Sequence, residues 1–144
     1  MRECLAQGCL PNGLGGANVQ DLAGKDLNNS PDLKYVIGLD YGTPINDSID
    51  GFVRVNFQWQ DEVNFSLLAD PSTVHGSYGI LNISAGIESP DGRYTFTAFV
   101  NNVLDEFYAS NFANLSNLYG DKVITQVVPR NAERHAGIRV KFNF

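Results

Sequence analysis

The most constraining feature of this chain is a strict alternation of apolar and polar residues that recurs in five segments. The last of these alternates Ala136, Ile138, Val140, Phe142 and Phe144 with His135, Gly137, Arg139, Lys141 and Asn143. Successive side chains of a β-strand point to opposite faces of its sheet, so this period predicts a strand with one apolar and one polar face. Similar alternation covers 33–45, 53–60, 81–88 and 94–101. The sequence therefore predicts an all-β fold.

Turn residues predict how these strands connect. Short polar segments, 46–50 (NDSID) and 89–92 (SPDG), separate neighbouring alternating segments, and Asp-Gly accommodates the backbone of a tight turn. The other connections, 66–76 and 109–131, are long and contain Pro, Gly, Ser and Asn. We therefore expect an up-and-down antiparallel sheet, with sequential pairing of strands near 33–45, 51–64, 77–89, 93–108 and 132–144.

The length of the alternating rows favours a membrane location. A transmembrane β-strand needs about 9–11 tilted residues, whereas ordinary strands average about 5–6. Outer-membrane barrels combine short turns on one side with long loops on the other, and their strands alternate between lipid and lumen. We expect Tyr35, Ile37, Val55, Phe57, Ile83, Phe96, Val140 and Phe142 to face lipid. We expect Arg54, Asn56, Gln58, Asn82, Thr97, Arg139 and Lys141 to face the lumen.

Aromatic residues gather at both ends of the predicted strands. Tyr41, Tyr94, Phe142 and Phe144 lie near the short turns, and Tyr35, Trp59 and Phe65 lie near the long loops. Such rings are expected where a barrel meets the two membrane–water interfaces. Phe144 resembles the terminal aromatic that outer-membrane barrels present to their assembly machinery.

Composition excludes several classes of protein. The net charge of −6 disfavours nucleic acid as a partner, because phosphate binding requires a basic face. With 43% hydrophobic and 18% charged residues the chain is not of the disordered type, and it has no apolar run of about 18 residues for a transmembrane helix. Serine and histidine occur without the context of a triad, so we predict no enzyme and no catalytic, cofactor-binding or metal-binding residues. His75 and His135 are expected to be solvated or to line the lumen.

The first residues carry two further expectations. They lack a basic region followed by an apolar stretch, and an outer-membrane protein must be exported, so we expect a fragment whose true start lies upstream. Cys4 and Cys9 are close enough in sequence for a loop disulfide in an oxidising compartment. Free thiols are the alternative, and a metal site would need further ligands nearby.

Three segments together resemble one protein family. These are 29–45 (NSPDLKYVIGLDYGTPI), 77–108 (SYGILNISAGIESPDGRYTFTAFVNNVLDEFY) and 128–144 (VPRNAERHAGIRVKFNF). The distinctive residues are the Tyr78 to Asn82 spacing, the Ser-Pro-Asp-Gly turn, Asn102, Asp105 and Tyr108, followed by Pro129, Arg130 and Gly137. From Asn29 onward the chain resembles the C-terminal end of a TonB-dependent receptor, a plugged transporter barrel of Gram-negative outer membranes.

The resemblance implies a fold, a function and partners. Residues 1–32 would be an extracellular loop segment, and 33–144 would be about the last five strands of a barrel that imports a scarce nutrient such as a ferric siderophore. The partners would be the rest of the barrel and its plug, the TonB energy-coupling complex, outer-membrane lipid, and the barrel assembly machinery through Phe144. The lumen-lining residues that would hold the plug are Arg54, Gln58, Glu62, Asn82, Glu88, Arg139 and Lys141.

Some family features have no counterpart in these 144 residues. The plug domain and the motif that engages TonB are both missing from them, so no ligand-binding residue can be carried over. Asn102 and Asp105 match family markers, and we expect them to satisfy backbone groups where a strand becomes a loop.

Two other functional classes remain open. A soluble β-sandwich binding module would bury each apolar face on a second sheet, and it would fold without detergent. A passive porin-type barrel would share the strands and lack a plug.

Overall fold

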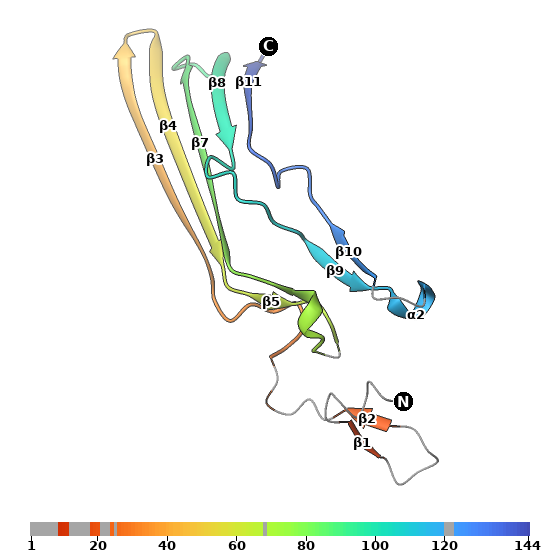
Figure 1. Ribbon diagram of the computed structural model, residues 1–144. Coiled ribbons are helices and arrows are strands. Elements are labelled where there is room, and N and C mark those ends of the chain that lie inside the picture. The colour runs from red at the N-terminus through yellow and green to blue at the C-terminus, as the bar shows by residue number, and fades with distance from the viewer. Residues whose placement is uncertain (1–8, 12–17, 21–23, 25, 68, 120–122) are drawn as a thin grey trace.

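The fold is dominated by one antiparallel sheet of five strands (Figure 1). The computed structural model describes residues 9–11, 18–20, 24, 26–67, 69–119 and 123–144. The strands are β3 (Lys34–Asn46), β4 (Ile49–Gln60), β7 (Tyr78–Glu88), β8 (Tyr94–Asn101) and β11 (His135–Phe142). Their order in the sheet is β11-β8-β7-β4-β3, so each strand pairs with its neighbour along this series. The predictions of an all-β fold and of sequential antiparallel pairing are confirmed.

The strand ends differ from the prediction at several places. The strand expected over 93–108 ends at Asn101, because Asn102 and Asp105 have φ angles of 51° and 56°, which break an extended backbone. The strand expected over 51–64 starts at Ile49 and ends at Gln60, before a separate short strand. The last strand spans only 135–142.

Short elements occupy the long connections. β5 (Val63–Asn64) pairs with β6 (Val74–His75), with the 3₁₀ helix η1 (Pro71–Thr73) between them. β9 (Asn111–Asn114) pairs with β10 (Ile124–Val127), and α2 (Ser116–Tyr119) lies between these two. Both groups lie at the ends of the strands opposite to the tight β3–β4 and β7–β8 turns (Figure 1). The predicted alternation of short turns and long connections is therefore present.

The remaining elements lie near the start of the chain. β1 (Cys9–Pro11) pairs with β2 (Asn18–Gln20). Cys4 lies outside the described residues, and so does the predicted pairing of Cys4 with Cys9. Within the described part of the chain, no helix has the length and hydropathy needed to cross a bilayer.

The strand register places every predicted apolar row on the same face of the sheet. Tyr35 lies opposite Trp59, Val55 opposite both Leu39 and Ile83, and Phe96 opposite both Ile87 and Val140. Residues directly opposite each other in neighbouring strands share a face. The two residue sets that the sequence assigned to opposite faces do lie on opposite faces. The described strands form an open sheet, with β3 and β11 at its edges, rather than a closed barrel.

Two aromatic residues fill the space above glycines on the polar face. A Cβ atom at Gly86 would come within 2.7 Å of the ring of Phe52, and one at Gly137 would come within 2.7 Å of the ring of Phe99. Each aromatic residue is the cross-strand neighbour of its glycine. The glycines therefore let large rings lie flat on the sheet, which is the aromatic rescue of glycine used to pin strand register.

Candidate functional site

The apolar face of the five-stranded sheet is broad and uncovered. Its large side chains are open to the surroundings, and Ile37 and Ile138 are 60% and 79% exposed. Tyr35 stacks on Trp59 at the long-loop end, with 5.5 Å between ring centroids. In the middle, Ala85, Ala98 and Ala136 line a shallow depression together with larger neighbours. Such an extensive apolar surface exceeds what monomers usually expose to water and indicates a membrane or protein contact.

The opposite face carries polar and charged side chains. Arg54 forms an ion pair with Asp40, with 3.0 Å between Nε and Oδ1, and its guanidinium lies 4.3 Å from the ring centroid of Phe52. Arg139 lies 5.7 Å from the ring centroid of Phe99. Because Arg54 and Asp40 are both largely exposed here, their attraction contributes little to stability while this face is in water.

The structure locates all the residues that were expected to line a lumen. Arg54, Gln58, Asn82, Glu88, Arg139 and Lys141 lie on strands of the sheet and on its polar face. Glu62 does not, because β4 ends at Gln60 and Glu62 lies in the connection to β5. The prediction that Glu62 lies on a strand of the sheet is therefore wrong.

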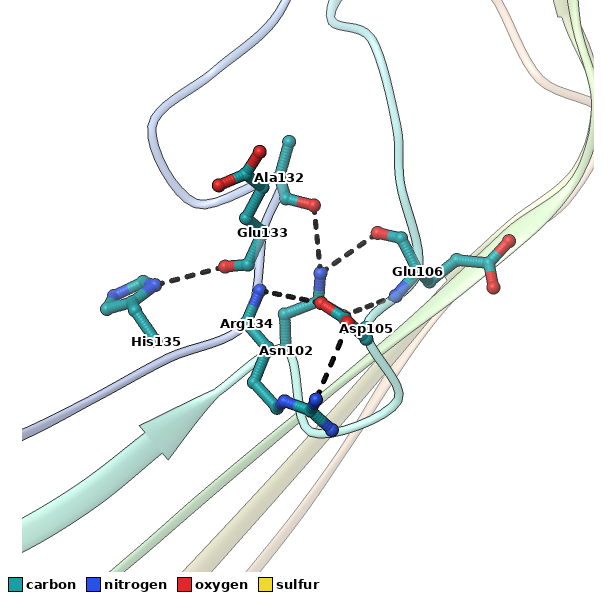
Figure 2. Close-up of polar contacts among 7 residues, drawn as sticks. All are labelled: Asn102, Asp105, Glu106, Ala132, Glu133, Arg134 and His135. Carbon is teal, nitrogen blue, oxygen red and sulfur yellow. Dashed lines mark hydrogen bonds and ion pairs between the residues drawn. The ribbon is translucent and has the colours of Figure 1, made fainter.

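A polar cluster ties two loops together just beyond the end of β8 (Figure 2). The side chain of Asn102 is fully buried. Its Nδ2 donates to the carbonyl oxygens of Glu106, at 2.9 Å, and of Ala132, at 3.1 Å, while its Oδ1 accepts from the Glu106 N–H at 3.0 Å. We call Asn102, Asp105, Glu106, Ala132 and Arg134 the Asn102 clasp, because they join the chain after β8 to the chain before β11.

Asp105 makes the second link of the clasp. Its Oδ1 accepts from the backbone N–H of Arg134 at 3.0 Å, and its Oδ2 lies 3.5 Å from Nη2 of the same residue. Both Asn102 and Asp105 have positive φ angles, which asparagine and aspartate tolerate better than most residues. The expectation that these two side chains satisfy backbone groups where the strand ends is confirmed.

Several of the residues that carry the family resemblance converge on this region. Oδ1 of Asn82 accepts from the backbone N–H of Asn102 at 3.0 Å. Tyr78 stacks on Tyr108 with 4.9 Å between ring centroids, and Tyr108 packs with Ile80 and Ala132 in a buried apolar cluster. Burial raises the pKa of the Tyr108 hydroxyl above its ordinary value. These five markers, Tyr78, Asn82, Asn102, Asp105 and Tyr108, are thus parts of one packed junction between sheet and loops.

The Ser-Pro-Asp-Gly turn is held by its own side chains. Ser89 Oγ donates to Asp91 Oδ1 at 2.6 Å, and the Arg93 N–H donates to the same oxygen at 3.2 Å. These two hydrogen bonds, the one from Ser89 first, lower the pKa of the Asp91 carboxyl. Gly92 adopts a φ of 70°, as predicted for the glycine of a tight turn.

The two histidines have different environments. His135 is exposed, and its Nε2 lies 3.0 Å from Asn101 Nδ2 across the β8–β11 pair. His75 is half-buried, and it accepts a hydrogen bond from the backbone of Ala109, 34 residues away in sequence. His75 is thus only partly open to solvent, and its contact with Ala109 was not part of the prediction. No local sequence signal marks this contact, because it depends on where a distant loop packs.

Neither a metal-binding group nor a similar protein of known function identifies a site in the described residues. Among the described residues, no three His, Cys, Asp or Glu side chains gather closely enough to hold a metal ion. No family model, curated protein or solved structure matches this chain. The described residues present the two faces of the sheet, its two open edges and the joined loops at one end.

Proposed function

We propose that this chain forms part of the wall of an outer-membrane β-barrel, namely the C-terminal strands of a TonB-dependent receptor. The observation that carries the proposal is the sorting of five strands into one continuous apolar face and one polar face. A barrel wall needs this division, because one face meets lipid and the other meets water or a plug. The transported cargo would be a scarce nutrient such as a ferric siderophore.

The open edges of the sheet support the same proposal. β3 and β11 each pair on one side only within the described residues. Unpaired backbone groups cost several kcal/mol each in hydrocarbon, so a sheet placed in a membrane requires further strands on both edges. The proposed partners are therefore the remaining barrel strands, with the plug against the polar face and lipid against the apolar face. Contacts with the TonB complex and, through Phe144, with the assembly machinery follow from the family resemblance.

A soluble β-sandwich is disfavoured by the position of the smaller sheets. A sandwich would cover the apolar face with a second sheet about 10 Å away. In the described residues, the β5–β6 and β9–β10 pairs lie beyond one end of the strands (Figure 1), and the apolar side chains remain exposed. A passive porin-type barrel would share the same wall, so transport activity has to distinguish it from a receptor.

Uptake measurements test the proposed transport. Deletion of the gene that encodes this chain should abolish energy-dependent uptake of one class of scarce nutrient, and inactivation of TonB should abolish the same uptake. Ferric siderophores labelled with radioactive iron are the first substrates to measure. Uptake that persists without TonB would instead indicate a passive barrel.

Lipid contact can be tested with the single tryptophan. Trp59 lies on the apolar face, so we expect lipids brominated along their acyl chains to quench at least half of its fluorescence in reconstituted protein. The matched control carries Trp59→Phe and Gln58→Trp, which moves the indole to the adjacent position on the polar face. Quenching in this control should be several-fold weaker. Equal quenching at both positions would contradict the assignment of faces.

A further inference from the structure

His75 joins two connections that are far apart in sequence. It is the last residue of β6, and its Nε2 accepts from the backbone N–H of Ala109 at 3.1 Å. Its ring also packs against Phe112 of β9, with 5.6 Å between ring centroids, and lies edge-on to Tyr78 at 5.2 Å. The imidazole therefore sits between the 61–77 connection and the segment that leads into the β9–β10 hairpin.

The hydrogen bonds of His75 define its protonation state. Nδ1 lies 2.7 Å from the carbonyl oxygen of Gly76, which only accepts, so Nδ1 carries the proton and donates it. Nε2 must then be unprotonated to accept from Ala109. The observed arrangement thus requires the neutral imidazole, since the protonated ring has two donors and no acceptor.

The backbone N–H of Ala109, which donates to Nε2, is too buried to bind water instead. Ala109 is only 1% exposed, so its N–H would remain in a poorly solvated position if Nε2 became protonated. Two N–H groups would then point at each other. His75 itself is only half-buried, so protons from solvent reach its ring. Histidine is the side chain that ordinarily changes charge between pH 5 and 8.

We propose that His75 is a proton-sensitive latch, closed by its bond to Ala109 when the imidazole is neutral and released when the imidazole is protonated. The released part would be the β9–β10 hairpin. Other contacts also link this hairpin to the 61–77 connection, among them a hydrogen bond from Asn114 Nδ2 to Asp70 Oδ2 at 2.7 Å and the rings of Phe65 and Phe112, which lie 5.7 Å apart. Release therefore loosens the hairpin and leaves the sheet intact.

The groups around the ring are compatible with this response. β7 contributes the Tyr78 side chain, which stacks on Tyr108, and β9 contributes the uncharged Phe112. On its own connection, Asp70 accepts hydrogen bonds from Ser72 and Asn114. Glu106, which lies before Ala109, donates and accepts through its backbone in the Asn102 clasp.

Amide hydrogen exchange, measured by NMR on the whole chain, tests the latch. The sample is prepared in buffer or in detergent micelles, and the condition is chosen in which the β7 amides exchange slowly. The protection factor, which corrects for the intrinsic effect of pH, should fall at least tenfold for Ala109 between pH 7.5 and pH 5, while β7 protection stays unchanged. In His75→Gln the Ala109 protection factor should be the same at pH 7.5 and pH 5. Its absolute level does not matter for the test, because only the difference between the two pH values reports the latch. His135→Gln, which alters the only other histidine, should preserve this difference.

Three results would overturn the latch. One is an Ala109 protection factor that is equal at both pH values in the unaltered chain. Another is a fall that persists in His75→Gln. The third is a parallel loss of protection in β7, which would show general acid unfolding. None of these results bears on whether the sheet faces lipid, so the latch and the proposed barrel wall can fail separately.

Discussion

Replacement of Val55 by arginine should lower the stability of the lipid-reconstituted protein by about 2–4 kcal/mol. Val55 lies in the middle of β4 on the apolar face, with Leu39 and Ile83 as its direct cross-strand neighbours. An arginine there would place its guanidinium near the bilayer midplane, where hydration is poorest. The free energy of unfolding, measured by reversible urea titration in lipid, checks this value.

The adjacent residue supplies the control for this experiment. Asn56 projects from the polar face between Gly38 and Asn82, so Asn56→Arg should change the stability by less than about 0.5 kcal/mol, as is usual for exposed positions. Asn82 is a poor control, because it also accepts the backbone hydrogen bond of Asn102. Equal tolerance of arginine at Val55 and Asn56 would defeat the barrel assignment. A soluble sandwich would show the same difference without any lipid, so folding in plain buffer must be recorded alongside.

Loss of the Asn102 side chain is expected to be comparably damaging. Asn102→Ala removes three hydrogen bonds to the backbone of Glu106 and Ala132 in a fully buried position. Buried groups left without partners cost about 1–3 kcal/mol each, and these losses are not additive. Alanine must also adopt the φ of 51°, and this left-handed conformation costs about 1–2 kcal/mol for residues other than glycine, asparagine and aspartate. We expect a total loss of about 3–5 kcal/mol.

Two variants separate the contributions at this position. Asn102→Gly removes the same hydrogen bonds but accepts the positive φ, so it should be less damaging than Asn102→Ala. Asn101→Ala changes the preceding residue, whose side chain makes an exposed contact with His135, and should cost less than about 0.5 kcal/mol. If Asn102→Ala were as mild as Asn101→Ala, the clasp would not be what holds the two loops together.

The alternating segments were enough to predict the sheet. A strand has a period of two, so the pattern assigned each side chain to a face before any pairing was known, and the register kept those assignments together. Tight turns at 46–50 and 89–92 also had local signals, because turn residues act within a few positions. The observed β3–β4 turn is tighter than expected, since Asn46 already pairs with Ile49.

The end of β8 could not be predicted from local pattern. Residues 102–108 contain enough apolar side chains to extend a strand, yet the backbone turns at Asn102. The turn is stabilised by Ala132, which lies 30 residues away, and by Asp105 with Arg134, which are 29 residues apart. Side-chain identity alone suggested that Asn102 and Asp105 would bind backbone, and only the packed loops decided which backbone groups they bind.

The sequence by itself determined which residues share a face, because alternation is a local property of an extended chain. Tertiary structure alone decided the joints at the loop end, because each of them brings together segments that are far apart in the sequence. His75 is the clearest case: its sequence neighbours mark it as a loop histidine, whereas the packing of a distant hairpin gives its Nε2 the buried amide of Ala109. Local propensity carries no information about such a partner, since the contact exists only after both connections have folded against the sheet.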